Sequence, residues 1–159
     1  CDESYIHSVQ LLGRADKEAS LFYNEYKKAE QRLINQPIKK MSNLTNKILS
    51  SIDYESIKQK RKENFEYLHN ELKEINLLEN IDIKSTPFIY PFITNDLQLR
   101  EKLIKNKIYI AKYWSEVLGR DSISNVEIDF VNKLIPLPID QRYDFDDMYR
   151  ILKIIKDNI

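Results

Sequence analysis

The chain has 159 residues, of which 42% are hydrophobic and 31% are charged, and these values are typical of a soluble globular protein. Its 25 basic residues are balanced by 25 acidic ones, whereas nucleic-acid-binding proteins usually carry a basic excess that displaces phosphate counterions. No apolar run approaches the roughly 20 residues that cross a bilayer, and no N-terminal signal segment is visible. Composition therefore disfavours both nucleic-acid and membrane partners.

Residue types that build common catalytic and metal sites are scarce. The chain has one cysteine, two histidines and two glycines, which excludes a disulfide framework and a cysteine-based zinc site. Phosphate-binding loops, dinucleotide fingerprints and nucleophile elbows all need clustered glycines. The residues alone offer no complete catalytic constellation and no metal site. One cysteine without a signal segment predicts a cytoplasmic location.

Three helices are predicted in the first half of the chain. Apolar residues recur at intervals of three and four over residues 14–34, and Pro37 ends or redirects this helix. A shorter helix is expected over residues 42–49, and a longer one over residues 53–75. His69 lies off the apolar face of the longer helix and is expected to be exposed. That face is formed by Ile57, Arg61, Phe65, Leu68, Leu72 and Ile75.

The clearest strand covers residues 88–93, an aromatic and β-branched run in which Pro91 indicates an edge or a bulge. A helix that directs Leu99 and Leu103 inward should follow. It is expected to end at Asn106 with left-handed backbone, since asparagine is the usual substitute for glycine there. Residues 108–110 are predicted to form a second short strand.

The last third of the chain contains four further elements. A brief helical turn is expected at residues 115–118, a helix at 125–133 and an extended apolar segment at 134–139. The final helix begins at Asp144 and buries a stripe formed by Met148, Ile151, Leu152, Ile155 and Ile159.

Capping residues mark the starts of four predicted helices, because a short polar side chain can accept a hydrogen bond from a free backbone N–H. The final helix is the best specified, since Asp144 and Asp147 can form a capping-box-like pair. The expected caps of the other three helices are Ser42 or Asn43, Asp53, and Thr94 or Asn95.

This order of elements predicts an α+β fold: a helical N-terminal half, then a small sheet of two to three strands covered by helices on one face. Residues 1–52 are expected to form a helical segment, and residues 53–159 a C-terminal α+β domain.

Several segments resemble consecutive motifs of one enzyme family. The run Met-Ser-Asn-Leu-Thr at 41–45 resembles an Arg-Met-Ser-x-Leu segment that opens a helix. Arg-Lys-Glu-Asn-Phe at 61–65 resembles a helix with Arg-x-x-Asn/Ala-x-x-Tyr/Leu, and residues 134–139 resemble a closing Leu-x-Leu-Pro segment. Over roughly residues 40–159 the chain resembles the C-terminal part of fold-type-I pyridoxal-phosphate aminotransferases, most closely the DegT/StrS sugar aminotransferases. The other matches are Tyr90-Pro91-Phe92, Leu99-Arg100-x-x-Leu103, Ile108, Tyr113-Trp114, Tyr143 and Asp147.

The resemblance implies a parent transaminase that moves an amino group from an amino acid, such as glutamate, to a keto sugar or sugar nucleotide. It also implies a homodimer in which a lysine of a large parallel-sheet domain holds pyridoxal phosphate. This chain has neither the strand–helix alternation of that domain nor a lysine in that context. We therefore expect it to be the C-terminal portion of a longer polypeptide, not catalytic and binding no cofactor alone.

The resemblance points to Lys39 and Lys40 as contacts for the cofactor phosphate across the dimer interface. The family has an asparagine and an arginine where this chain has Ile38 and Lys40. A lysine supplies a point charge without the bidentate geometry of arginine, so the match is divergent. The alternative is a surface pair that flanks a helix start.

The substrate-binding candidates are Tyr113, Trp114 and Arg142. The two aromatic residues would line the substrate mouth, or would pack in the core of the domain. The histidine that the family places before the aromatic residue is Lys112 or Tyr113 here. Arg142 would bind a substrate carboxylate, or would be a surface loop arginine.

A second hypothesis is a non-catalytic interaction module that has inherited the aminotransferase-like shape without the activity. In that case the helix that begins near Arg14 would dock to a partner. The coding sequence upstream of Cys1 distinguishes the two hypotheses, because only the first requires a preceding large domain that carries a lysine.

Overall fold

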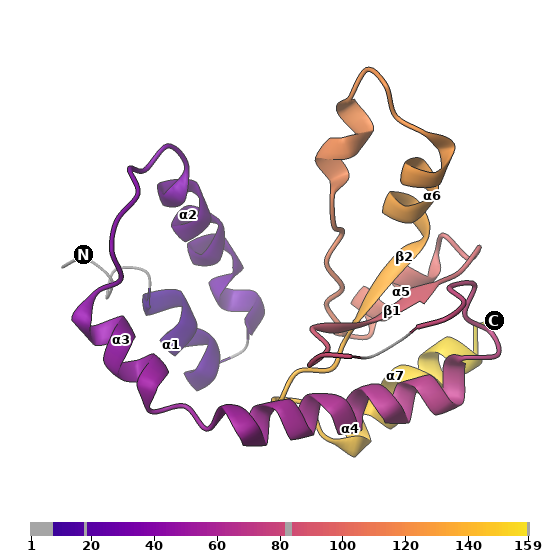
Figure 1. Ribbon diagram of the computed structural model, residues 1–159, viewed down its shortest axis with the longest axis horizontal. Helices are drawn as coiled ribbons and strands as arrows, with labels where there is room; N and C mark the ends of the chain where they lie inside the picture. The colour runs from indigo at the N-terminus through magenta and orange to yellow at the C-terminus, as the bar shows by residue number, and fades with distance from the viewer. Residues whose placement is uncertain (1–7, 18, 82–83, 159) are drawn as a thin grey trace. The chain divides into compact units, whose positions relative to one another are not determined.

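The computed structural model describes residues 8–17, 19–81 and 84–158 (Figure 1). The chain divides into two compact units, Cys1–Asp53 and Tyr54–Ile159, which we call unit 1 and unit 2. Helices dominate the described residues, and one two-stranded antiparallel sheet accompanies them in unit 2. The chain is therefore α-rich and belongs to the α+β class in the broad sense. Its small sheet has two strands, the lower end of the predicted range of two to three.

Unit 1 contains α1 (Val9–Asp16), the 3₁₀ helix η2 (Ala19–Phe22), α2 (Tyr23–Leu33) and α3 (Asn43–Ser50). The prediction of one continuous helix over residues 14–34 is wrong, because Lys17 takes extended backbone and ends α1. The chain turns back so that the ring of Phe22 lies against Gly13. A Cβ atom at Gly13 would come within 2.2 Å of that ring, so a larger residue there would displace the Phe22 side chain.

The predicted helix over residues 42–49 is confirmed as α3. Its N-cap is Ser42, whose Oγ accepts a hydrogen bond from the backbone N–H of Thr45 at 3.1 Å. Before α3 the chain runs without regular structure, and Asn35 there adopts a positive φ of 59°. Asparagine tolerates this left-handed conformation better than most residues, so the exit from α2 is locally explained.

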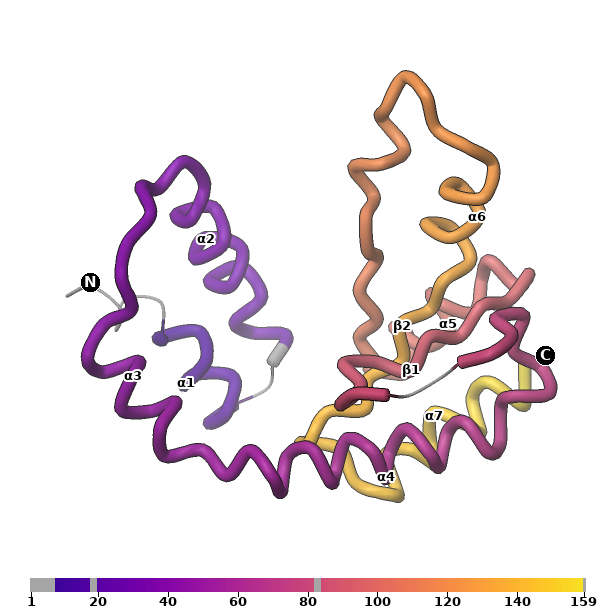
Figure 2. The backbone as a smooth tube through the Cα atoms, viewed as in Figure 1, coloured from indigo at the N-terminus to yellow at the C-terminus, as the bar shows by residue number. Residues whose placement is uncertain are grey.

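Unit 2 alternates helices with the two strands (Figures 1 and 2). The helix predicted over residues 53–75 is confirmed as α4, which ends three residues earlier, at Leu72. The predicted turn at 115–118, helix at 125–133 and final helix are also confirmed. The elements are α4 (Tyr54–Leu72), β1 (Ile89–Ile93), α5 (Leu99–Lys105), η3 (Ser115–Gly119), α6 (Asn125–Lys133), β2 (Leu134–Pro138) and α7 (Phe145–Lys156).

The sheet pairs β1 with β2 in antiparallel register, with Tyr90 opposite Leu137 and Phe92 opposite Ile135. These four side chains are buried on one face of the sheet. The prediction of a second strand at residues 108–110 is wrong: the partner of β1 is the segment predicted only to be extended. Residues 108–110 instead pack irregularly, with Ile108 and Ile110 buried.

Proline residues fit the sheet because of its register. Pro91 lies opposite Pro136, so neither residue of this pair can donate a ladder hydrogen bond. In an antiparallel ladder, every second pair directs its N–H groups away from the partner strand. Ile93, two residues from Pro91, directs its N–H outward to the side chain of Asn76. The prolines therefore occupy positions where the ladder needs no donor.

The core of unit 2 lies between the sheet and the helices α4 and α7. These two helices pack against each other, and α4 also packs against β1. Their buried side chains come from one face of each helix, as the apolar stripes predicted. The prediction is wrong for Ile75, which lies beyond the end of α4 and is exposed, and Ile57 and Arg61 are only half-buried. Ile159 lies outside the described residues. Full burial of each large side chain contributes roughly 1.5–3 kcal/mol. These residues are Phe65, Leu68 and Leu72 of α4 and Met148, Ile151, Leu152 and Ile155 of α7.

The ends of α5 and α7 test the capping predictions. Asp144 and Asp147 form the predicted capping box of α7, with N···O distances of 3.0 and 3.2 Å. Neither Thr94 nor Asn95 caps α5, whose N-cap is Gln98. Thr94 instead accepts a hydrogen bond from the N–H of Asp96 and forms a turn that precedes the helix.

The C-terminal end of α5 also differs from the prediction. Asn106 has a φ of −87°, and the left-handed residue is the next one, Lys107, with a φ of 63°. The side chain of Asn106 donates to the carbonyl of Lys102 at 2.9 Å, so it satisfies a helix-end acceptor directly.

Candidate functional site

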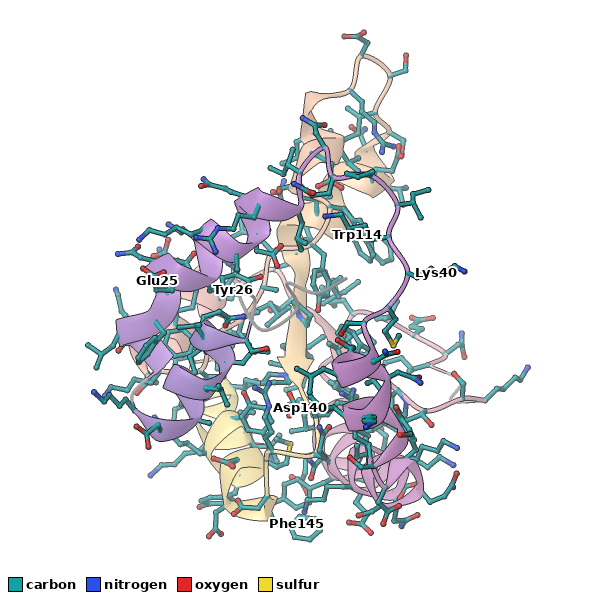
Figure 3. All side chains as sticks on the ribbon, turned by 90° about the vertical axis from the view of Figure 1, so that its left-hand side faces the viewer. Glu25, Tyr26, Lys40, Trp114, Asp140 and Phe145 are labelled. Atoms are coloured by element: carbon teal, nitrogen blue, oxygen red, sulfur yellow. The ribbon has the colours of Figure 1, made fainter. Side chains whose placement is uncertain are left out.

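The two lysines predicted to contact a cofactor phosphate lie in the irregular segment of unit 1 between α2 and α3. Lys39 and Lys40 are both exposed. Figure 3 shows the side chain of Lys40 extending away from the ribbon. Among the residues that the structure describes, neither ammonium group has a recorded hydrogen bond or ion pair. Both charges are thus open to an external anion.

The predicted aromatic pair lies in unit 2, where the chain leaves α5, runs outward through η3 and returns through α6 (Figure 2). The rings of Tyr113 and Trp114 are tilted at 57° with centroids 5.6 Å apart. Trp114 has left-handed backbone (φ 54°, ψ 30°) and remains half exposed. Its carbonyl accepts a hydrogen bond from Val117 and closes the first turn of η3.

Trp114 forms part of the wall of an open pocket of about 250 Å³ between η3 and α6. We call this pocket the arm pocket. The structure therefore places Trp114, though not Tyr113, in the wall of a cavity. The residues that line it are Trp114, Val117, Val126, Glu127, Phe130 and Val131.

Arg142 lies at the corner between β2 and α7 and is held by Asp140. The guanidinium Nε and Nη2 donate to the two carboxylate oxygens at 2.8 Å each, and the backbone N–H of Arg142 donates at 3.1 Å. Burial acts to raise the pKa of Asp140, but the hydrogen bonds from Arg142 outweigh it and lower that pKa. The same side-chain hydrogen bond raises the pKa of Arg142.

Arg142 already has a carboxylate partner within the chain, although its side chain is largely exposed. A guanidinium carries five N–H groups, and Asp140 uses two of them. Trp114 and Asp140 are well separated in Figure 3. Among the described residues no recorded contact joins Arg142 to Trp114, so the structure does not bring these candidates into one site.

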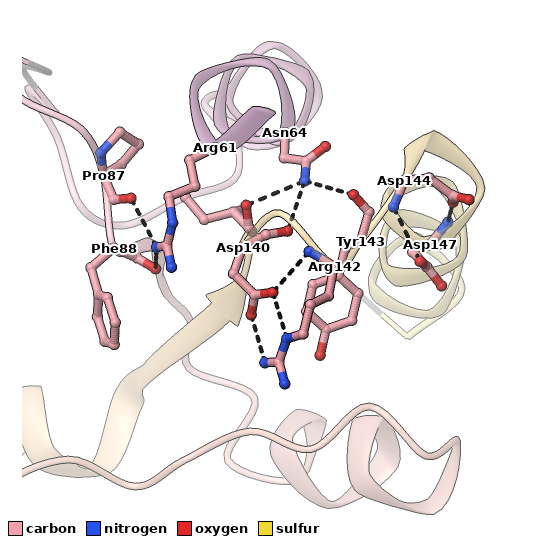
Figure 4. Close-up of polar contacts among 10 residues, drawn as sticks. Arg61, Asn64, Pro87, Phe88, Asp140, Arg142, Tyr143, Asp144 and Asp147 are labelled. Atoms are coloured by element: carbon pink, nitrogen blue, oxygen red, sulfur yellow. Dashed lines mark hydrogen bonds and ion pairs between the residues drawn. The ribbon is translucent and has the colours of Figure 1, made fainter. Parts of the chain in front are cut away.

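Two residues of α4 join it to other segments of unit 2 (Figure 4). Both belong to the segment that resembles the aminotransferase family, but the sequence did not predict their contacts. Asn64 is fully buried, and its Nδ2 donates to the carbonyls of Ile139, Asp140 and Tyr143 at 3.1–3.3 Å. Two signals could have identified it: it lies beside the apolar face of the helix, and it matches the asparagine of the family-like segment at 61–65.

Arg61, one turn before Asn64, reaches in another direction (Figure 4). Its Nη1 donates to the carbonyls of Pro87 and Phe88 at 3.3 and 3.1 Å, just before β1 begins. Its guanidinium also lies 5.6 Å from the centroid of the Phe88 ring. Together Arg61 and Asn64 fix the start of one strand and the corner that follows the other.

A second polar cluster surrounds the hydroxyl of Tyr90. This residue is fully buried, and its oxygen lies 3.4 Å from Nδ1 of His69 and 3.3 Å from Nδ2 of Asn76. The prediction that His69 is exposed is wrong, since it is half-buried one helical turn after Phe65. Burial raises the pKa of the Tyr90 phenol, which the hydrogen bond from Asn76 only partly offsets.

We predict that Tyr90 makes the stability of the chain sensitive to alkali. The unfolded phenol loses its proton near its ordinary pKa of 10.0, whereas the buried phenol keeps it to higher pH. The contribution is therefore present below that value and is lost as the pH rises through the folded pKa. Urea unfolding between roughly pH 9 and pH 11 should show a smaller alkaline loss for Tyr90→Phe than for the unmodified chain.

The matched control for this experiment is Tyr109→Phe, which removes the same hydroxyl from an exposed tyrosine. Its alkaline loss should equal that of the unmodified chain. Equal alkaline losses for Tyr90→Phe and the unmodified chain would contradict the assignment.

No family model, curated protein or solved structure matches this chain. Within the described residues, no three His, Cys, Asp or Glu side chains are grouped so that they could hold a metal ion. Likewise, none of the described helices combines the length and apolarity of a membrane span.

Proposed function

We propose that this chain is the C-terminal region of a pyridoxal-phosphate-dependent aminotransferase-like protein. The parent would transfer an amino group from an amino acid to the keto group of a sugar or sugar nucleotide. The observation that carries the proposal is the pair Arg61 and Asn64, which belong to one segment that resembles the family. Their side chains reach Phe88, beside the Tyr-Pro-Phe strand, and Ile139, at the end of the closing segment. Three segments that resemble the family thus meet in one unit.

In this proposal unit 2 is the small domain of the aminotransferase. Its two strands and the helices α4 and α7 form the layer that would close over substrate. Unit 1 would form the link to the large domain, and the parent would act as a homodimer.

The residues of this chain that suit pyridoxal phosphate are Lys39 and Lys40. Each exposed ammonium group can place a positive charge on a phosphate, without the bidentate geometry of arginine. The cofactor, when bound to the parent, would supply the electron sink for amino transfer. Tyr113 and Trp114 would line the substrate mouth. Arg142, held by Asp140, would use its remaining N–H groups for a substrate carboxylate.

The full-length polypeptide that contains this chain provides the test. We expect its purified form to absorb as a lysine-linked Schiff base and to aminate a keto sugar nucleotide with glutamate as donor. The 159-residue chain alone, mixed with pyridoxal phosphate, should show no Schiff-base band. A full-length protein that fails to bind the cofactor, or a lysine-linked cofactor on the 159-residue chain, would refute the proposal.

A non-catalytic interaction module is the second candidate, and one observation favours it. The described residues of unit 1 bury no large apolar side chain, while many are exposed on its helices. The single docking helix expected from Arg14 is replaced by α1 and α2, so such a surface would span several short helices. Failure of the full-length protein to bind the cofactor would favour this candidate. The exposed residues include Leu11, Leu12, Leu21, Leu33, Ile34 and Ile48.

A further inference from the structure

The arm pocket has the construction of a small ligand site. One wall comes from α6, where Val126, Glu127, Phe130 and Val131 follow a helical spacing that places them on one face. The facing residues are Trp114, which precedes η3, and Val117 within η3. Val131 is buried, whereas Trp114 and Phe130 remain partly exposed. The pocket therefore has an apolar floor and an aromatic rim.

The backbone conformation of Trp114 also indicates that this pocket has a function. A bulky residue with φ of 54° is a genuine outlier, and such residues cluster at ligand sites and switch regions. The volume of about 250 Å³ is large enough for a ring, since an apolar cavity of about 150 Å³ accepts benzene. The geometry thus favours a ring-sized occupant.

Glu127 sets the polarity of that occupant, because it is the one ionisable side chain in the pocket wall. Its Oε2 accepts hydrogen bonds from the backbone N–H and the hydroxyl of Ser124 at 2.9 and 2.8 Å. Those bonds, with the nearby charge of Arg120, lower the pKa of Glu127, so it is ionised at neutral pH. No donor is recorded for Oε1 among the described residues. The carboxylate can therefore accept a hydrogen bond from a ligand and would repel an acid.

We propose that the arm pocket binds a small aromatic molecule that carries an N–H or O–H donor, and that it discriminates against aromatic acids. The ring would lie between Trp114 and Phe130 above Val131, and the donor group would bond to Glu127. This site rests only on the residues of the pocket wall, so it holds whether or not the aminotransferase proposal is correct, although Trp114 is also a candidate for the substrate mouth in that proposal.

The test uses three probes that share one ring: benzyl alcohol, benzylammonium and benzoate. Trp114 is the single tryptophan of the chain, so its indole N–H gives one NMR signal that reports on the pocket. We expect benzyl alcohol and benzylammonium to shift this signal saturably, with millimolar dissociation constants suited to ligands of this size. Benzoate should bind about fivefold more weakly, the size expected for two like charges about 4 Å apart in water. The chain has no net charge, and Arg120 near Glu127 would favour benzoate, so weaker binding of benzoate would report the carboxylate of Glu127.

Two variants separate the ring contact from the charge. Glu127→Gln keeps a residue that a capping box accepts and removes the charge, so the preference against benzoate should fall below about threefold. Phe130→Ala should weaken benzyl alcohol binding at least about fivefold. Tyr109→Ala, which removes an exposed aromatic side chain outside the pocket, should leave binding unchanged. Absence of a saturable shift, equal binding of benzoate, or unchanged binding in Phe130→Ala would each overturn the proposal.

Discussion

Replacement of Asn64 by aspartate is expected to lower the free energy of unfolding of the chain by about 3–5 kcal/mol at neutral pH. The change is nearly isosteric, but it replaces the Nδ2 donor of three carbonyl groups by an oxygen. Oδ1 of Asn64 has no hydrogen-bond partner among the described residues, so the amide acts here only through its donor half. The substitution would therefore place an uncompensated negative charge against three acceptors in a fully buried position.

The pH dependence of this variant gives a second readout. Burial without a donor raises the folded pKa of the new carboxyl above its unfolded value. Its destabilising effect should therefore be largest at neutral pH and should shrink as the pH falls and the group is protonated. Urea unfolding of both chains between roughly pH 4 and pH 7 measures the difference.

Two further variants complete the Asn64 experiment. Asn64→Ala removes the donor without adding a charge and should cost about 2 kcal/mol at every pH in this range. Asn70→Ala changes an exposed residue of the same helix and should alter stability by less than about 0.5 kcal/mol. An Asn64→Asp chain as stable as the Asn70→Ala control would show that the three recorded hydrogen bonds contribute nothing.

Local sequence signals predicted most helices of unit 2. They failed where contacts between residues far apart in the sequence determine the structure. The capping box of Asp144 and Asp147 was predictable because all of its partners lie within one turn. The strand that pairs with β1 was not predictable, since residues 108–110 and 134–138 are both short apolar runs. Prolines in the second run cannot donate ladder hydrogen bonds, and only the register reveals that they occupy positions where no donor is needed.

The break in the first predicted helix has a similar cause. Apolar periodicity continues from α1 into α2, because each helix keeps its own apolar face. The contact between Gly13 and Phe22 that accompanies the turn cannot be seen in that periodicity. An amphipathic pattern therefore indicated helical structure correctly but not where one helix ends and the next begins.

The candidate site was the least predictable part of the chain. Lys39, Lys40, Tyr113, Trp114 and Arg142 came from resemblance, and their roles stay predictions. Sequence reasoning assigned no role to the buried asparagines that organise unit 2, because their bonds join segments far apart in the chain. Asparagine is common at helix ends and turns, so its type does not distinguish a local cap from a long-range anchor.

Asn76 is the second such anchor, and Asn76→Ala is expected to lower the free energy of unfolding by about 2–4 kcal/mol. The residue is buried just after α4, and its side chain covers the outer edge of β1. Its Oδ1 accepts from the N–H of Ile93 at 3.0 Å, and its Nδ2 donates to the carbonyl of Pro91 at 2.8 Å. The backbone N–H of Leu77 also donates to the carbonyl of Ile93 at 3.0 Å, so the Asn76 amide and Leu77 together supply the partners that a third strand would offer.

The same substitution should change the edge of the sheet in a way that a general loss of packing would not. Without the side chain, the N–H of Ile93 loses its recorded partner and faces solvent, so its hydrogen exchange should accelerate by at least about tenfold under native conditions. An uncovered strand edge is also a template for pairing with other chains, so self-association should increase with concentration. NMR exchange and sedimentation measure the two effects.

Asn132→Ala provides the control, since it makes the same change at an exposed residue of α6. It should leave both the exchange of Ile93 and the oligomeric state unchanged. If Asn76→Ala lowered stability while the Ile93 amide stayed protected, the asparagine would act through its contacts with Tyr90 and Leu78 rather than through the strand edge. The role of the Asn76 side chain at this edge can therefore be measured directly at one backbone amide, that of Ile93.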